Sequence, residues 1–421
     1  VEVPDLGDDT RQWGPPFAPS GESAYFLCIN RNKRSLTLNL KSEQGLHILK
    51  QLVQKSDVLV ENFRVGTLEK WGMSYEALQS LRPGLIYCTI TGYGYTGPYR
   101  HLPGYDFIIQ AQGGVMSITG PEEGEPYKVG VAIADITAGL FACNAILAAL
   151  FDHARSGRGQ RIDISLLDCQ VAWLANVASN YLVSGETPGR FGNAHPNIVP
   201  YQTFRANDGY FALAIGNDGQ WRQFCERAGK PDWADDARFR TNADRVQNRK
   251  SLIPLLEDLF CGSSIAHWSS LLEAAGVPFG PINSVDHALG DPQVLAREMV
   301  IQATQPGRNP IKLVASPLKI PTAPVQVRFP PPALGEHTCQ ILHELLGMDE
   351  KALDDLRNCG LFDLYLNLGD LTTLTMSHFT TSAVETASPK VRKKSALPHE
   401  ADLCRLKQPA KAGLVVFEAV I

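Results

Sequence analysis

The chain has 421 residues, of which 44% are hydrophobic and 20% charged, and its formal net charge is −5. This length exceeds the size at which one hydrophobic core keeps growing, so we expect two domains. The negative charge gives no general attraction to nucleic acid or to anionic membranes. The longest apolar run, residues 140–151, is shorter than the ~18 residues that span a bilayer and is typical of a buried core helix.

The nine cysteines are scattered and form no CxxC pair. This pattern argues against a zinc site and against a disulfide framework. It favours a reducing compartment, such as the cytosol or the mitochondrial matrix.

The first part of the chain alternates strand and helix patterns, which predicts βαβ units and a parallel sheet. Residues 35–40 alternate apolar and polar side chains, as a half-buried strand does. The next patterns predict a helix over 43–55 capped by Ser42, a strand over 57–60, a helix over 67–81 and a strand over 85–90. Ligands bind beyond the carboxyl ends of such strands, so the residues that follow each strand are candidates for a site.

A long apolar helix is predicted over 136–155, and an alternating strand follows at 161–166. The character of the chain changes near residue 200, where two strand patterns flank Asn207-Asp208-Gly209, a strong hairpin signal. Helix patterns then follow over roughly 219–228, 250–260, 264–275 and 336–346. These features predict a smaller α+β domain. Residues 377–400 are poor in apolar side chains, and we expect them to be disordered.

Several common motifs are missing from the sequence. No GxxxxGK[ST] motif and no HExxH spacing is present, and no GxSxG elbow is found. The basic stretch 31–34, with Lys41 nearby, is suited to holding phosphates, and solvated surface charge is the alternative. Asn62 and Phe63 are suited to binding a purine, and ordinary loop packing is the alternative.

Asp135 lies in the segment GVAIADITAG, between small apolar residues and the start of a helix. From these residues alone, a helix N-cap is the more common interpretation and a catalytic carboxylate is the other. A pair with Asp106 would suit acid–base chemistry, but the sequence does not show that the two meet. The residues by themselves therefore indicate an α/β ligand-binding protein whose site is unassigned.

Seven segments together resemble the class III CoA-transferase family, the group that contains formyl-CoA and carnitine-CoA transferases. They are GDDTRQW (7–13), NRNKRSLTLNLKS (30–42), DVLVENFRVGTLEKWG (57–72), GYDFIIQAQGG (104–114), ADITAG (134–139), SGRGQRIDISLLD (156–168) and GEHTCQILHELLG (335–347). The segments follow the family in order and spacing over about residues 1–358. Within the family, the similarity is greatest to its dicarboxylate-specific mitochondrial members.

The resemblance implies an α/β fold with a large Rossmann-like parallel-sheet domain and a smaller α+β domain, assembled as an interlocked dimer. We expect a large domain over 1–198 without the family's first βα unit, a small domain over 199–315, a return to the large domain over 316–358 and an atypical, partly disordered tail over 359–421. The resemblance makes Asp135 the catalytic residue and places Asp106 near the site. It assigns CoA binding to Leu38, Lys41, Asn62, Phe63, Lys70, Trp71 and Tyr105.

The family's chemistry implies transfer of CoA from succinyl-CoA to a dicarboxylic acid, such as glutarate or hydroxymethylglutarate, through an aspartyl-CoA thioester. CoA is a substrate, and neither a metal nor another cofactor is expected. We further expect a homodimer in the mitochondrial matrix with no nucleic-acid or membrane partner. An ordinary aspartate has a pKa near ~3.9, so Asp135 is expected to be ionised at neutral pH.

Two alternatives remain open. Acyl-CoA racemases share the fold and carry a histidine where this chain has Tyr105, so the tyrosine favours acyl transfer. A catalytically impaired CoA-binding isoform is the other alternative. For the remote carboxylate of a dicarboxylic acid, the sequence offers Arg190 or His195 as the cation.

Overall fold

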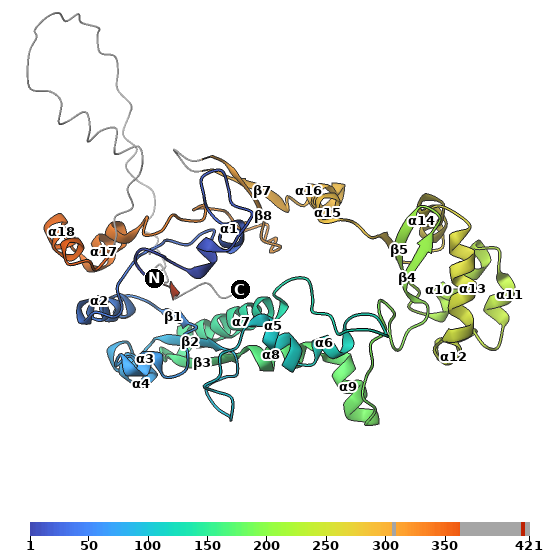
Figure 1. Ribbon diagram of the computed structural model, residues 1–421, viewed down its shortest axis with the longest axis horizontal. Helices are drawn as coiled ribbons and strands as arrows, with labels where there is room; N and C mark the ends of the chain where they lie inside the picture. Colours follow the sequence, from blue (N-terminus) through green and yellow to red (C-terminus); the bar gives the residue numbers. More distant parts are fainter. Residues whose placement is uncertain (305–308, 363–413, 417–421) are drawn as a thin grey trace, which may run out of the picture.

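The computed structural model describes residues 1–304, 309–362 and 414–416. Figure 1 shows two bodies at opposite ends of the molecule, joined by two connecting segments. The large domain is built on a parallel sheet of order β3-β2-β1-β9. Its strands are β1 (Val58–Glu61), β2 (Ile86–Thr91), β3 (Gln160–Ser165) and β9 (Leu414–Val416). The predicted α/β class with a parallel sheet is therefore confirmed.

Strands β1 and β2 form the centre of this sheet, and nearly all of their residues are buried. Such continuous burial is typical of parallel strands that have helices on both faces. Strand β9 pairs in parallel with β1 and forms the edge of the sheet. The segment 377–400, for which we expected disorder, lies outside the described residues.

The local signals of the first part are mostly confirmed. Helix α2 (Glu43–Gln54) is capped by Ser42, whose hydroxyl accepts the Gly45 N–H at 3.0 Å. The inner face of this helix is buried. The predicted strand over 35–40 is wrong. Only Thr37 forms a bridge, because the backbone of this segment hydrogen-bonds to two different segments, at Glu2 and Leu361, and so forms no ladder.

The prediction of a single helix over 67–81 is also wrong. The structure has two short helices, α3 (Thr67–Lys70) and α4 (Tyr75–Leu81). The break falls at Gly72, which has a positive φ of 66°. Glycine adopts this conformation readily, and it ends the first helix.

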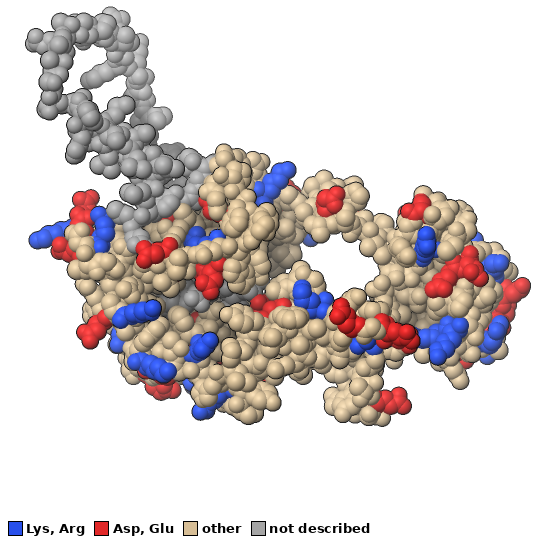
Figure 2. Space-filling view, in the orientation of Figure 1, with Lys and Arg blue, Asp and Glu red and all other residues tan. Residues whose placement is uncertain are grey.

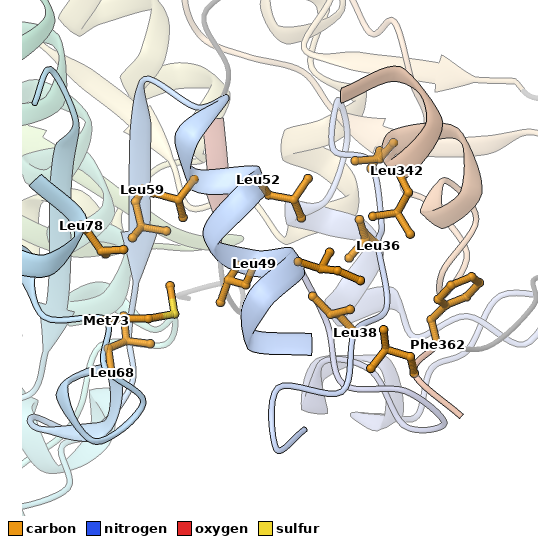
Figure 3. Close-up of a cluster of buried hydrophobic side chains, with 14 of the residues drawn as sticks. Leu36, Leu38, Leu49, Leu52, Leu59, Leu68, Met73, Leu78, Leu342 and Phe362 are labelled. Carbon is orange, nitrogen blue, oxygen red and sulfur yellow. The ribbon is translucent and has the colours of Figure 1, made fainter. Parts of the chain in front are cut away.

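One core cluster joins the start of the large domain to residues near 362 (Figure 3). In it, Leu49 and Leu52 of α2 pack with Leu38, and Leu342 and Phe362 complete the cluster. Helices α17 (Thr338–Leu346) and α18 (Glu350–Asn358) also contribute to this cluster, and Phe362 follows α18 in the chain. The expected tail over 359–421 therefore includes two residues, Leu361 and Phe362, that are buried in the core.

Helix α7 (Ile133–Ser156) crosses the other face of the sheet. It buries small residues, among them Ala134, Ala138 and Ala142, against the strands. By length and composition alone, α7 is the one helix of the described chain that is apolar enough to cross a membrane. The expectation that 140–151 is a buried core helix is wrong, because only the small residues of α7 are buried and several large ones are exposed.

The small domain is formed by residues 199–281. Its antiparallel sheet has the order β4-β5-β6. Its elements are β4 (Tyr201–Ala206), β5 (Gly209–Ala214), α10 (Asp218–Arg227), α11 (Pro231–Asp235), α12 (Asn242–Gln247), α13 (Arg249–Cys261), α14 (Ile265–Ala274) and β6 (Phe279–Pro281). The predicted hairpin at Asn207-Asp208-Gly209 is confirmed.

The chain returns from the small domain through α15 (Val285–Gly290), α16 (Pro292–Ala296), β7 (Val300–Ala303) and β8 (Ile311–Val314). Hairpin β7–β8 lies beside α1 (Ala24–Ile29) of the large domain, and Arg31 Nη1 donates to the Val314 carbonyl oxygen at 3.1 Å. The predicted small domain over 199–315 thus covers both the small-domain core and this hairpin.

Candidate active site

The candidate residues gather at the carboxyl edge of the parallel sheet. The turn Asn62–Phe63 follows β1 directly, and Gly92 follows β2. The chain passes from β2 through α5 (Asp106–Gln112), α6 (Val115–Ile118) and α7 before it enters β3 in the same direction. The first turn of α7, which holds Asp135, therefore lies at this edge as well.

Asp106 performs the capping role that the sequence had assigned to Asp135. The N-cap position of α7 is Ala132, which makes no side-chain cap. Instead, Asp106 Oδ1 accepts the Ala134 N–H at 2.8 Å. Asp135 is thus the third residue of the helix, and its carboxylate is not used for capping.

Gln110 holds the segment that leads into α7. Its side chain is fully buried, and its Oε1 accepts the Val129 N–H at 2.9 Å. Its Nε2 donates to Asp106 Oδ2 at 2.7 Å and to the Val131 carbonyl oxygen at 3.4 Å. One buried amide therefore fixes both the capping carboxylate and the approach to Asp135.

Burial and, to a smaller extent, the negative charge of Asp106 together raise the pKa of Asp135 to about 7. The expectation of an ordinary aspartate pKa is therefore wrong. Partial removal from water and a like charge outweigh the favourable field of the helix N-terminus. The Asp135 carboxyl therefore changes its ionisation near neutral pH.

A close backbone contact sets the position of the segment before Asp106. A Cβ built on Gly92 would lie 2.6 Å from the Gly104 Cα, and one built on Gly104 would lie 2.5 Å from the Gly92 Cα. Any side chain at either position would clash, so both must be glycine. This contact closes the base of the loop 93–103 and places Tyr105 and Asp106 at the sheet edge.

The turn after β1 presents a polar atom without a partner. Asn62 Oδ1 is buried and accepts no hydrogen bond from the described residues. Phe63 beside it is half-buried and meets the Trp71 ring edge-on, with the ring centroids 5.4 Å apart. An acceptor and an aromatic pair therefore lie together at the predicted CoA site.

The other residues predicted to contact CoA differ in how exposed their side chains are. The Leu38 side chain is buried in the large-domain core, and its backbone N–H donates to the Glu2 carbonyl oxygen at 2.9 Å. Lys41 and Lys70 are exposed, and Tyr105 is 71% exposed. Lys41 precedes α2, while Lys70 ends α3 next to Trp71.

The basic stretch 31–34 is partly occupied by protein contacts. Arg34 forms an ion pair with Glu344 at 2.6 Å, and Arg31 donates to a backbone carbonyl, as described above. Burial lowers the pKa of Lys33, although Asp8 and Glu2 act in the opposite direction.

The two cations suggested for a remote carboxylate take other roles. Arg190 donates from Nε to the Pro121 carbonyl oxygen at 2.8 Å and from Nη2 to the Gly124 carbonyl oxygen at 2.7 Å. It therefore fastens the loop 121–124. Burial and the nearby Arg249 lower the pKa of His195, which favours the neutral ring over a cation.

Three residues near the candidate site were given no role from the sequence: Gln110, Tyr25 and Glu61. Burial raises the pKa of Tyr25 on α1, and the nearby charges of Asp135 and Asp106 act in the same direction. Glu61 ends β1 and is 1% exposed. Its position after the predicted strand over 57–60 was the one sequence signal that pointed to it.

Residues 1–338 match the family model described as CoA-transferase family III. Succinyl-CoA:glutarate CoA-transferase of Mus musculus is 44% identical over 363 residues, which is 86% of this chain and 83% of the mouse protein. Succinate–glutarate CoA-transferase of Agrobacterium fabrum is 44% identical, covering 84% of this chain and 89% of the bacterial protein.

Solved structures show the same likeness. The crystal structure of a CAIB/BAIF family protein from Brucella suis superposes with a TM-score of 0.72 and 45% sequence identity. The match covers 82% of this chain and 90% of the Brucella chain. The sequence and structure comparisons therefore agree on the family over more than four-fifths of the chain.

Proposed function

Because the chain belongs to CoA-transferase family III, we propose that it moves CoA from succinyl-CoA to a dicarboxylic acid such as glutarate, with Asp135 as nucleophile. One observation carries the role of Asp135: its carboxylate lies at the carboxyl edge of the sheet and is freed from capping because Asp106 caps α7. The names of the relatives from mouse and Agrobacterium support the substrate pair. The chain is an enzyme that transfers CoA.

The proposed reaction begins when an Asp135 oxygen attacks the thioester carbonyl carbon of succinyl-CoA. The carbon–sulfur bond breaks, which gives the CoA thiolate and an aspartyl–succinyl anhydride. The thiolate then attacks the Asp135 carbonyl carbon and breaks the anhydride carbon–oxygen bond. Succinate leaves, and an aspartyl-CoA thioester remains.

The acceptor reverses these steps. A glutarate carboxylate attacks the aspartyl-CoA thioester and expels the thiolate, which leaves a mixed anhydride of Asp135 and glutarate. The thiolate attacks the glutaryl carbonyl carbon, so glutaryl-CoA leaves and the Asp135 carboxylate is restored. No proton or electron is gained or lost in the cycle, so we propose that neither a metal nor a redox cofactor takes part. Water must be excluded while the anhydride exists.

For CoA itself, we propose the turn after β1 as the main contact. Asn62 Oδ1 supplies a buried acceptor for an N–H group of the ligand, and the Phe63–Trp71 pair supplies an apolar surface. Lys41 and Lys70 are exposed cations that suit the CoA phosphates. Leu38 and Tyr105 complete the proposed contact set.

We also propose that the working enzyme is a homodimer. Figure 2 shows an opening through the molecule between the two domains and the segments that join them. Large apolar side chains of α7 are exposed, including Leu140, Leu147 and Phe151. A second copy of the chain would bury such a surface. The described cysteines are all free thiols, which supports a reducing compartment such as the mitochondrial matrix.

Chemical trapping tests the nucleophile. Incubation with succinyl-CoA and hydroxylamine, without an acceptor acid, is expected to convert Asp135 to a hydroxamate that peptide mapping identifies. The Asp135→Asn variant is expected to bind CoA and to lose transfer by on the order of 10³-fold or more.

Asp168→Asn is the matched control, since Asp168 also lies in the first turn of a helix, α8 (Leu166–Trp173), after a strand of the same sheet. It should retain transfer. Full transfer in Asp135→Asn, or a hydroxamate on a different residue, would overturn the mechanism. Exchange of the substrate α-proton with solvent deuterium, without exchange of CoA between acids, would favour a racemase instead.

A further inference from the structure

Glu61 is a buried carboxylate that the proposed chemistry does not use. It is the last residue of β1 and directly precedes the turn Asn62–Phe63. Its Oε2 accepts the Phe63 N–H at 2.7 Å. This bond closes the turn on itself and fixes the direction in which the chain leaves the sheet.

The other oxygen of Glu61 reaches the neighbouring strand and its loop. Oε1 accepts from the Tyr87 hydroxyl at 3.2 Å and, more weakly, from the Tyr95 hydroxyl at 3.5 Å. Tyr87 lies on β2, where it is buried and stacked on Tyr75, with ring centroids 5.9 Å apart. The carboxylate thus links the turn after β1 to the rigid centre of the sheet.

Tyr95 is itself anchored to the third strand. Its backbone N–H donates to Asp163 Oδ2 at 3.0 Å, and the Arg161 guanidinium lies 4.2 Å from its ring centroid. Both Asp163 and Arg161 belong to β3. Glu61 therefore contacts β2 through Tyr87 and is linked to β3 through Tyr95.

A buried carboxylate is costly unless its oxygens are satisfied. Burial and the nearby charge of Glu69 on α3 raise the pKa of Glu61, the Phe63 N–H and the two tyrosine hydroxyls lower it, and the net value is about 7. An apolar residue would avoid the cost of burial but would leave the Phe63 N–H without its acceptor.

We propose that Glu61 is a positioning residue for CoA, which holds Phe63 through one oxygen and the hydroxyls of Tyr87 and Tyr95 through the other. The bond to Phe63 sets the turn so that the unpartnered Asn62 Oδ1 faces the ligand. This inference rests on the proposed function, since it takes the turn after β1 to be the CoA contact. Glu61 acts only through its neighbours and touches no reacting atom.

The test compares two variants of Glu61 by calorimetric titration of the full chain with CoA. Glu61→Ala leaves the Phe63 N–H without its acceptor, and CoA is expected to bind roughly tenfold to a hundredfold more weakly. Glu61→Gln keeps an oxygen for that N–H and should bind CoA within about threefold of the wild type. Glu69→Gln, an exposed acid close by on α3, is the matched control and should bind as the wild type does.

Steady-state kinetics separate positioning from general damage. For Glu61→Ala we expect a raised KM for succinyl-CoA, with the KM for the acceptor acid and kcat changed by less than about threefold. Equal increases in both KM values would point to a general structural role and overturn the proposal. Tyr95→Phe removes the weaker hydroxyl bond to Glu61, together with the contact between the Tyr95 and Tyr87 hydroxyls, and should fold normally. It therefore provides a second test if Glu61→Ala is unstable, and its CoA affinity should fall slightly while kcat is unchanged.

The outcomes distinguish this inference from the proposed function. If the wild type binds CoA and transfers it, but Glu61→Ala binds CoA equally well, the positioning role is wrong and the transferase function stands. If the wild type neither binds nor transfers CoA, the proposed function itself fails.

Discussion

Helix α13 of the small domain and helix α7 of the large domain are both apolar, but they are covered differently. On α13, Leu252, Leu256 and Phe260 are fully buried. Phe260 meets the rings of Phe204, Phe211, Phe224 and Trp268, with centroids 4.9–5.8 Å apart. The small domain therefore satisfies its own apolar residues, as an independent core does.

Helix α7 places its small residues on the sheet and its large ones outside. Ile136, Leu140, Leu147 and Phe151 are exposed and lie on one helical face, because they are spaced by four, seven and four residues. Phe151 is 69% exposed. The small domain thus buries its large apolar residues within its own core, whereas the large domain leaves an apolar face of α7 exposed, which is the face of the proposed dimer contact.

The largest expected effect comes from charging that face. In the Leu147→Glu, Phe151→Glu double variant, two carboxylates would have to be buried at the proposed contact between copies, which is strongly unfavourable. We expect light scattering to give the mass of two chains for the wild type and of one chain for the variant, with unchanged circular dichroism.

Leu255→Glu is the matched control, since it adds the same charge to a partly exposed position of α13 and should leave the dimer intact. A wild-type protein that is monomeric at micromolar concentration would refute the proposed dimer. Binding of the wild type to lipid vesicles, lost in the double variant, would show instead that α7 meets a membrane surface.

A second variant tests whether the small-domain core is self-sufficient. Phe260→Ala removes the ring around which the aromatic cluster is arranged, and we expect it to lower the free energy of unfolding by about 3–5 kcal/mol. Urea unfolding followed by tryptophan fluorescence measures this, because Trp221 and Trp268 lie in the same core.

For α7 we expect a much smaller change in the free energy of unfolding. Leu140→Ala truncates a side chain that is exposed in the single chain. The free energy of unfolding of the monomer should therefore change by less than about 0.5 kcal/mol. A loss as large as that of Phe260→Ala would contradict the contrast between the two helices.

Sequence patterns predicted the helices and strands far better than they predicted the contacts that these elements make. Periodicity gave α2, β1, β2 and α7 because each is a local property of the chain. It did not show which face of α7 is covered, since the 3.6-residue repeat is the same for a buried and an exposed stripe. Nor did it show strand β9, whose partner β1 lies more than 350 residues earlier in the chain.

For the candidate site, too, the sequence indicated the residue but not its contacts. Asp135 was identified from seven segments in register, and its position in the structure agrees with that role. Its raised pKa and the capping by Asp106 depend on contacts between α5 and α7, which no local pattern contains. Glu61 was missed for the same reason, since its hydroxyl partners lie 26 and 34 residues away.

A further expected effect concerns the cost of placing Asp135 at the site. In the unfolded chain this carboxyl loses its proton near pH ~4, whereas in the folded protein it does so near about 7. Between these values the folded state binds more protons than the unfolded state, so the wild type loses stability as pH rises from 4 to 7. Asp135→Asn lacks this titration and keeps the shape of the side chain.

The melting temperature of Asp135→Asn should therefore equal that of the wild type near pH 4, exceed it increasingly up to pH 7 and remain a constant ~2–4 °C above it at higher pH. Glu61 titrates in both proteins, so its contribution cancels in the difference. Differential scanning calorimetry across this range, with Asp168→Asn as control, measures the effect. A difference that does not vary with pH would mean that folding leaves the pKa of Asp135 unchanged and that the site holds this carboxylate at no electrostatic cost.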